Sequence, residues 1–155
     1  MELEQVYEVK INWTGNLGEG TRDYAAYSRN YTISANNKID IQASSDSIFR
    51  GDARLYNPEE LFLASVSSCH MLWYLHLCAD AGIVIESYTD NPVGQLSLQH
   101  IPAKFTKIVL NPVISIQQEE NVELAHQLHN EAHKKCFIAN SCNFQILVEP
   151  IIKVI

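Results

Sequence analysis

The first third of the chain alternates apolar and polar residues with the period of two that is typical of half-buried β-strands. Residues 7–13 show this alternation most clearly, and the glycine-containing segment 14–20 interrupts it. Residues 24–33 and 38–41 continue the pattern, so the three segments are predicted to form an antiparallel meander. Residues 44–56 lack a regular period and are expected to form a loop that leads into a helix.

A helical segment follows, and the sequence marks both of its ends. Asn57 is a predicted N-cap, and Pro58 occupies the first helical position. Glu59 and Glu60 come next, where the positive end of the helix dipole favours carboxylates. Gly82 is the expected stop, because glycine readily takes the left-handed conformation that ends many helices.

Residues 61–79 carry no charge, and the run is long enough to raise the question of a membrane span. It contains three serines and two histidines and is flanked by acidic residues, so a central helix covered by protein is expected instead. Cys78 is expected to point away from Cys69 and to be structural. The face predicted to carry Cys69 consists of Phe62, Ser65, Val66, Cys69, Leu72, Trp73 and His76.

The second half of the chain is predicted to alternate between strands and a second helix. Segments 83–88, 93–98 and 105–116 are rich in β-branched residues and are predicted strands, as is segment 144–154. The second helix is predicted over residues 119–136. Because no internal repeat or linker is present, all 155 residues are expected to form a single domain. The apolar face of the second helix is predicted to consist of Leu124, Leu128, Ala132 and Cys136.

Composition and charge narrow the classes of function. The net charge is -7 and the pI about 5.3, which would repel phosphate backbones, so nucleic-acid binding is not expected. The acidic N-terminus differs from a secretory signal, so a cytoplasmic location is expected. The four cysteines are then expected to be reduced and to serve as buried filling, metal ligands or catalytic thiols. No CxxC pair is present, which disfavours a structural zinc site.

Two cysteines are placed where they could carry chemistry. A buried cysteine stays an unreactive thiol unless a cation stabilises its thiolate. Cys136 ends the second predicted helix, where the dipole disfavours a thiolate. Cys69 lies three turns into the first helix and gains little from the dipole, so its activation has to come from a charged side chain.

Two cysteine motifs resemble those of the OsmC/Ohr family. The first is Asn-Pro-Glu-Glu-Leu-Phe at 57–62, followed by Cys69. The second is Ala-His-Lys-Lys-Cys at 132–136, followed by Ala-Asn-Ser at 139–141. Gly-Thr-Arg-Asp at 20–23 is similar to the arginine motif of the Ohr branch. The resemblance covers nearly the whole chain in the expected order.

The resemblance implies an α+β, OsmC-like fold in which antiparallel sheets wrap around two long central helices of an intertwined homodimer. It also implies an enzyme that reduces organic hydroperoxides to alcohols. Cys69 would attack the peroxide and become a sulfenic acid, and Cys136 would form a disulfide with it. An external dithiol, of lipoyl type in the Ohr branch, would reduce that disulfide. Neither a metal nor another cofactor is expected.

The expected cation is Arg22, because guanidinium stays charged and can hold both a thiolate and a peroxide oxygen. Glu59 would orient it through a carboxylate fork, although Glu59 could equally be a carboxylate that only stabilises the helix start. Arg29, Arg50 and Arg54 could take the place of Arg22.

The second cysteine motif allows either of two resolving cysteines, and the aromatic residues allow either of two roles. Phe137 replaces the proline expected after Cys136, and Cys142 is an alternative resolving cysteine. Phe62 and Trp73 are expected in the core or, as substrate-binding residues, in a pocket for the alkyl part of a hydroperoxide.

The histidines and the apolar helix face support two other functions. His126, His129 and His133 recur at i, i+3 and i+7 and could present imidazoles to a metal. A solvated or interface face is preferred for them, since they lie beside the apolar stripe. The main alternative to the enzyme is a non-catalytic binding module that holds a lipophilic ligand between the helices, with Cys69 merely packing. No membrane partner is expected.

Overall fold

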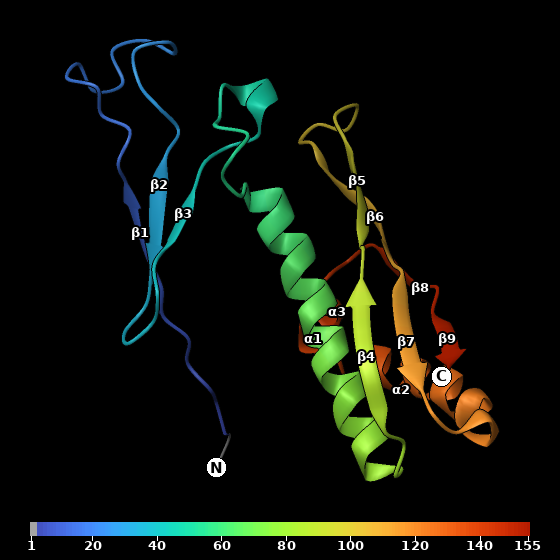
Figure 1. Ribbon diagram of the computed structural model, residues 1–155. Helices are drawn as coiled ribbons and strands as arrows, with labels where there is room; N and C mark the ends of the chain where they lie inside the picture. Colours follow the sequence, from blue (N-terminus) through green and yellow to red (C-terminus); the bar gives the residue numbers. More distant parts are fainter. Residues whose placement is uncertain (1–2) are drawn as a thin grey trace. The chain divides into compact units, whose positions relative to one another are not determined.

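The computed structural model describes residues 3–155 (Figure 1). The chain divides into two compact units, the first ending at Leu61 and the second running from Phe62 to Ile155. The boundary between the units falls inside the first long helix.

The first unit is built on a three-stranded antiparallel sheet, which confirms the predicted meander. The strands are shorter than the alternation predicted, because residues 24–30 form turns and loop. Trp13 Nε1 donates a 2.8 Å hydrogen bond to the carbonyl of Ser28 and closes this loop onto the end of β1. A short 3-10 helix, η1 (Ser47–Phe49), lies in the predicted loop. The strands are β1 (Lys10–Trp13), β2 (Tyr31–Ser34) and β3 (Ile41–Ala43).

The first long helix, α1 (Pro58–Asp80), begins where the sequence predicted. Asn57 Oδ1 accepts a 2.8 Å hydrogen bond from the Glu60 amide, and Glu60 Oε2 accepts one of 3.2 Å from the Asn57 amide. This reciprocal pair is a capping box, which satisfies two amides that the helix itself leaves without a partner.

Gly82 terminates α1 in the predicted manner. Its φ is +72°, and its amide bonds to the carbonyl of Ala79 at 3.1 Å. The amide of Ile83 bonds to the carbonyl of Cys78 at 2.8 Å, and both side chains are buried in one core. The two bonds and the apolar contact form a Schellman motif.

Gly82→Ala is expected to lower the free energy of unfolding by about 1 kcal/mol, because a Cβ disfavours the left-handed conformation. A built Cβ meets no heavy atom within 4 Å, so backbone strain is the cause. Urea unfolding at pH 7 measures the change as a lower midpoint at unchanged slope. Gly82→Asn is the matched control with a smaller expected loss, and equal losses for both variants would contradict the account.

The second unit contains two mixed three-stranded sheets, of order β4-β7-β9 and β5-β6-β8. In each sheet one pair is antiparallel and the C-terminal strand pairs in parallel, so the expected α+β fold is confirmed and its sheets in this unit are mixed where antiparallel sheets were expected. The predicted strand 105–116 is interrupted at Asn111, and the predicted strand 144–154 is interrupted at residues 149–150. The strands are β4 (Ile85–Asp90), β5 (Val93–Ser97), β6 (Lys104–Leu110), β7 (Pro112–Ile116), β8 (Gln145–Val148) and β9 (Ile151–Val154).

Both interruptions place consecutive strands in different sheets. The Asn111 amide donates a 2.7 Å hydrogen bond to Asp90 Oδ1 instead of joining a ladder. Pro150 has no amide hydrogen and cannot donate to a ladder. The chain can therefore leave one sheet and enter the other at these two points.

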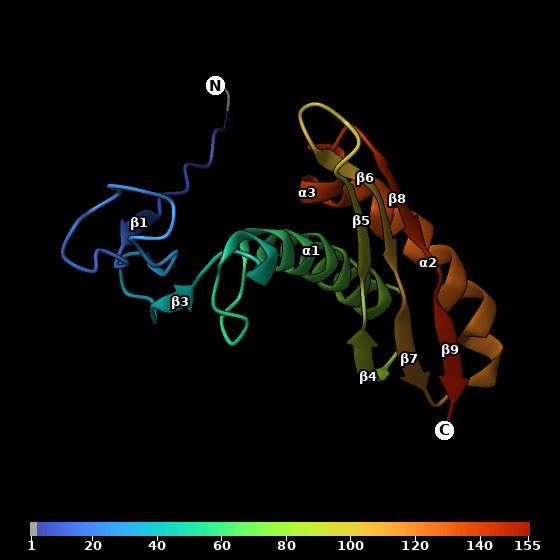
Figure 2. The same cartoon turned by 90° about the horizontal axis from the view of Figure 1, so that it is seen from above.

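The predicted second helix is present and is followed by a further turn of helix. Figure 2 shows α2 alongside the C-terminal strands β8 and β9. Cys136 separates α2 from the short helix after it. These elements are η2 (Glu119–Asn121), α2 (Val122–Lys135) and α3 (Phe137–Asn140).

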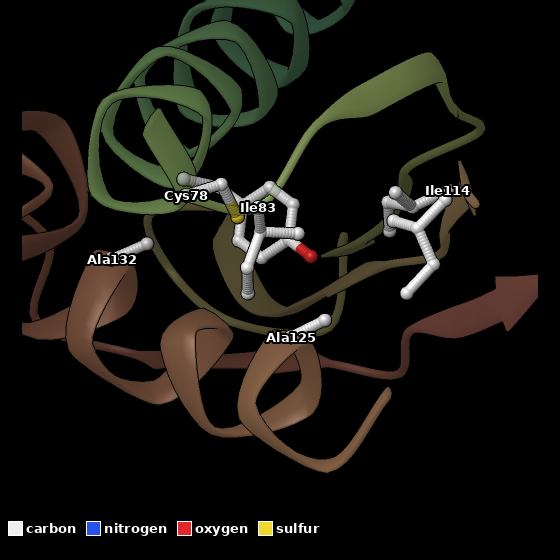
Figure 3. Close-up of a cluster of buried hydrophobic side chains, with 7 residues drawn as sticks. Cys78, Ile83, Ile114, Ala125 and Ala132 are labelled. Atoms are coloured by element: carbon white, nitrogen blue, oxygen red, sulfur yellow. The ribbon is translucent and has the colours of Figure 1, made fainter. Parts of the chain in front are cut away.

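The buried faces of the two long helices differ from the predicted faces. Leu72 and His76, predicted on the Cys69 face of α1, are exposed, and Leu124 of α2 is partly exposed. Figure 3 shows Cys78 of α1, Ala125 and Ala132 of α2, and Ile114 of β7 around one core. The residues buried along α1 are Val66, His70, Tyr74 and Cys78, and those along α2 are Ala125, His129 and Ala132.

Length and composition alone would allow α1 to cross a membrane. Its buried stripe, however, carries a histidine, a tyrosine and a cysteine that pack against α2 and the strands. Core helices of soluble proteins pass the same test of length and hydropathy, so this property is weak evidence for a span.

Candidate active site

Cys69 and Cys136, the two cysteines expected to react, lie near one another within the second unit. Cys69 is half-buried in the middle of α1, and Cys136 is fully buried directly after α2. The Cys69 side chain is close enough to that of Cys136 to raise its pKa, and both are free thiols. Two helices from distant parts of the sequence therefore bring two reduced thiols near one another.

The environment of Cys136 favours the neutral thiol. Burial and, after it, the hydrogen bond with Cys69 raise the pKa of Cys136 to about 11. The amide of Ala139, 3.4 Å from Sγ, opposes this shift because it donates to the sulfur. At pH 7 Cys136 is thus a poor first nucleophile, as the position at the end of α2 predicted.

The two other cysteines have different partners. The Cys142 thiol donates a 3.2 Å hydrogen bond to the carbonyl of Ile138, and burial raises its pKa. Cys78 is fully buried beside Tyr74, and burial raises its pKa as well. Of the three other cysteines, Cys136 is the one that interacts with Cys69. The core position of Cys78 agrees with its predicted structural role.

All four arginines of the chain lie in the first unit. Two of them are held by their own loops. Arg29 donates 2.6 Å hydrogen bonds to the carbonyls of Tyr24 and Tyr27. Arg54 donates two hydrogen bonds, of 3.0 and 2.7 Å, to the carboxylate of Asp52, and these bonds hold the pKa of Asp52 near 2.

Arg22, the predicted cation, is exposed and pairs with acidic residues of its own turn. Its guanidinium donates to Glu19 and lies 3.7 Å from Asp23. Among the described residues of this unit no ion pair joins Arg22 to Glu59, so the predicted carboxylate fork is not formed. Glu59 instead lies near Tyr31. Burial raises the pKa of Tyr31, and the negative charge of Glu59 raises it further. An exposed ion pair such as that with Glu19 is weak and can exchange for another anion.

The two aromatic residues expected to bind substrate have different surroundings. Phe62 packs in an aromatic cluster, with ring centroids 5.2 Å from Phe105 and 6.2 Å from Phe144. Its side chain is therefore engaged in core packing. Trp73 lines a hollow of about 200 Å³ together with Leu72 and His76.

Trp73 also contacts two residues that flank Cys136 in the sequence. Its ring meets the ring of Phe137 edge-on at 5.6 Å, and the Lys135 ammonium lies 5.4 Å from its centroid. The hollow thus adjoins side chains from both cysteine-bearing segments, α1 and the end of α2.

Two buried histidines, one from each long helix, form a hydrogen bond next to the cysteines. The histidine from α1, His70, directly follows Cys69 in the sequence. His70 Nε2 and His129 Nδ1 are 3.0 Å apart, and the side chains are 1% and 2% exposed. The Tyr74 ring stacks on His129 with a centroid distance of 3.7 Å. Burial lowers the pKa of His70 to about 4 and that of His129 to about 3, so both rings are neutral at pH 7.

This pair corrects the interpretation of the histidine spacing. His129 does not belong to a solvated face, because it lies in the core and bonds to His70. The spacing of four residues from His70 to Tyr74 and on to Cys78 is present in the sequence. The sequence fits an apolar stripe through Cys69 as well, so it does not by itself select the stripe through His70. Within residues 3–155 no group of three or more His, Cys, Asp or Glu side chains is arranged to hold a metal ion.

Comparison with protein families identifies the chain. Residues 51–150 match the family model described as OsmC-like protein. This match covers more than half of the chain, and the chain belongs to the OsmC-like family. No curated protein matches it.

Solved structures agree with the family. An OsmC-like protein of unknown function from Vibrio cholerae has 31% sequence identity and a TM-score of 0.87, over 96% of this chain and all of the other. An organic hydroperoxide resistance protein OsmC from Legionella pneumophila has 18% identity and a TM-score of 0.65, over 97% of this chain and all of the other.

An organic hydroperoxide resistance protein from Elizabethkingia anophelis has 19% identity and a TM-score of 0.64, over 99% of this chain and all of the other. The last two identities are low, so these two structures support the fold alone.

Proposed function

We propose that this protein is a thiol peroxidase that reduces organic hydroperoxides to alcohols. The proximity of the Cys69 and Cys136 thiols carries the proposal, because a two-cysteine peroxidase needs a second thiol that can reach the oxidised one. Membership in a family that includes organic hydroperoxide resistance proteins supports it. The cytoplasm is the proposed compartment, since the resting state requires reduced thiols.

The proposed reaction starts at the Cys69 thiolate and ends with both thiols restored. The Cys69 thiolate attacks one peroxide oxygen, an S–O bond forms, the O–O bond breaks, and the alcohol leaves after taking up a proton. The Cys136 thiol then attacks the sulfenic sulfur, an S–S bond forms, and the S–O bond breaks. The departing hydroxide takes the Cys136 proton and leaves as water. An external dithiol, of lipoyl type by family resemblance, supplies two electrons and two protons to restore both thiols.

An arginine of the first unit is the proposed source of positive charge for Cys69, because guanidinium stabilises both a thiolate and the developing charge on peroxide oxygen. Arg22 is the first candidate, and its exposed pair with Glu19 leaves it free to change partners. The hollow beside Trp73 is the proposed place for the alkyl part of the substrate.

The proposal is tested by incubating the reduced protein with cumene hydroperoxide and mapping thiols and disulfides by mass spectrometry. The expected result is a Cys69–Cys136 disulfide and one cumyl alcohol per disulfide formed. Unchanged thiols without peroxide loss would contradict the enzyme and favour the lipophilic-ligand binder. A Cys69–Cys142 disulfide would retain the activity and replace the resolving residue.

A homodimer is the proposed active form. The first unit exposes apolar side chains on its sheet, with Ile11 59% exposed, Trp13 42% and Ile41 43%. A three-stranded sheet with so little buried surface needs further cover to be stable. Sedimentation equilibrium at micromolar concentration is expected to give twice the chain mass of 17.5 kDa. A monomer mass over the whole concentration range would contradict this prediction.

A further inference from the structure

The hydrogen bond between His70 and His129 is a directional polar contact between α1 and α2 in the core. Its nitrogen atoms are 3.0 Å apart, and the two rings are almost parallel, with an angle of 9° between their planes. Because both rings are neutral at pH 7, one donates its N–H and the other accepts. A bond of this kind is satisfied at one relative position of the two helices.

Of the other buried side chains on these two faces, Tyr74 stacks on the same His129 ring at a centroid distance of 3.7 Å, and none among the described residues adds a second hydrogen bond between the helices. Val66 of α1 and Ala125 and Ala132 of α2 are apolar, and two of the three are small. Apolar packing is non-directional, so neighbouring registers of the two helices differ little in the area that they bury. A single buried polar contact selects one register, as buried asparagines do in coiled coils.

The same two helices carry the two reactive thiols. Cys69 directly precedes His70 in α1, and Cys136 follows His129 by two turns of α2. The amide of Cys136 is bonded to the carbonyl of His133, which ties the cysteine to the helix end. Any slide or rotation of α2 against α1 therefore changes the separation of the two sulfur atoms.

We propose that the His70–His129 hydrogen bond is a positioning device that fixes the register of α1 against α2 and thereby holds Cys136 within reach of Cys69. Neither histidine touches the reacting atoms in this role, so both are positioning residues. The inference rests on the proposed function in one respect, namely that the two thiols form a disulfide. It adds two residues that the peroxidase mechanism itself does not use.

The effective concentration of one thiol beside the other measures this positioning directly. In glutathione buffer, two protein thiols and one glutathione disulfide exchange to give the Cys69–Cys136 disulfide and two molecules of glutathione. Two electrons and two protons pass from the protein to glutathione, so the reaction is balanced without any peroxide. The equilibrium constant rises with the effective concentration of the two thiols.

The test compares apolar and polar replacements of the same rings. In a double variant, His70→Leu with His129→Leu, the core stays filled but the hydrogen bond is lost. We expect its equilibrium constant for disulfide formation to fall about tenfold, which is a reduction potential higher by about 30 mV. His70→Gln and His129→Asn, each alone, keep a polar atom near the bonded nitrogen. Both are expected to stay within about threefold of the wild-type value.

Controls separate positioning from general loss of stability. Ile116→Val weakens the same core from β7 and is expected to leave the equilibrium constant unchanged. If the double leucine variant folds and keeps the wild-type constant, the inference is overturned. If that variant does not fold, the single variants His129→Leu and His129→Asn decide, and equal constants for these two would overturn it.

The proposed function and this inference fail in different ways. A protein without peroxide turnover, but with the expected shift in the glutathione equilibrium, would contradict the peroxidase and retain the positioning pair. A wild-type chain that forms no Cys69–Cys136 disulfide at any glutathione ratio would overturn the positioning pair.

Discussion

Cys69→Ser is expected to abolish the reduction of organic hydroperoxides, with a fall in kcat/KM of roughly a thousandfold or more. A serine hydroxyl is not ionised at neutral pH and does not form the sulfenic acid on which the proposed turnover depends. Peroxide consumption in the presence of dihydrolipoamide measures the effect. Cys69 is half-buried, and among residues 3–155 its side chain has no polar partner apart from Cys136. The variant is therefore expected to fold normally.

Replacement of the second thiol gives a different result. Cys136→Ser is expected to reduce about one equivalent of peroxide and then stop, because the sulfenic acid has no thiol within reach. Cys78→Ser and Cys142→Ser are the matched controls, and both are expected to retain multiple turnovers. Multiple turnovers by Cys136→Ser together with a single turnover by Cys142→Ser would reassign the resolving residue.

The second large effect expected is a loss of stability in acid caused by the buried histidine pair. The pKa of each ring in the folded protein lies well below its ordinary value of 6.5, at about 4 for His70 and about 3 for His129. Between pH 6.5 and 4 the unfolded chain therefore binds protons that the folded chain does not bind. Stability is fully present above pH 6.5 and falls as the pH decreases, by up to about 1.4 kcal/mol per pH unit for each histidine.

Urea unfolding between pH 7 and 4, followed by circular dichroism, measures this slope. A double variant, His70→Gln with His129→Asn, removes both titrating rings and is expected to flatten the slope. His100→Asn removes an imidazole that is exposed to water and is expected to leave the slope as in the wild type. An unchanged slope in the double variant would show that other groups cause the acid sensitivity.

Local signals in the sequence predicted the helix ends, and the family motifs singled out Cys69 and Cys136 as a candidate pair. The capping box at Asn57 and the Schellman motif at Gly82 each depend on residues that are neighbours in the sequence, so the amino-acid types suffice to predict them. Cys69 and Cys136 were predicted as partners from the family motifs around them, and in the structure their side chains lie near one another.

The buried faces of the helices were predicted less well, because hydrophobicity alone does not show which side of α1 is buried. That helix is apolar on nearly every side, and a stripe through Cys69 and a stripe through His70 fit the sequence equally. The partner surface selects the second stripe, since His129 of α2 offers the hydrogen bond that a buried His70 requires. The interruption of the strand at Asn111 was missed for a similar reason, because its partner, Asp90, is distant in the sequence.

The sequence by itself determined where the helices begin and end, which two cysteines form a pair of motifs, and which family the chain resembles. These properties depend on backbone preferences and on motifs read directly from the chain. Only the tertiary structure decided that His70 and His129 form a buried neutral pair and that Arg22 pairs with Glu19 and not with Glu59. The physical reason is that hydrogen bonds and ion pairs are satisfied by whichever partner lies within about 3 Å to 4 Å, and packing determines that partner.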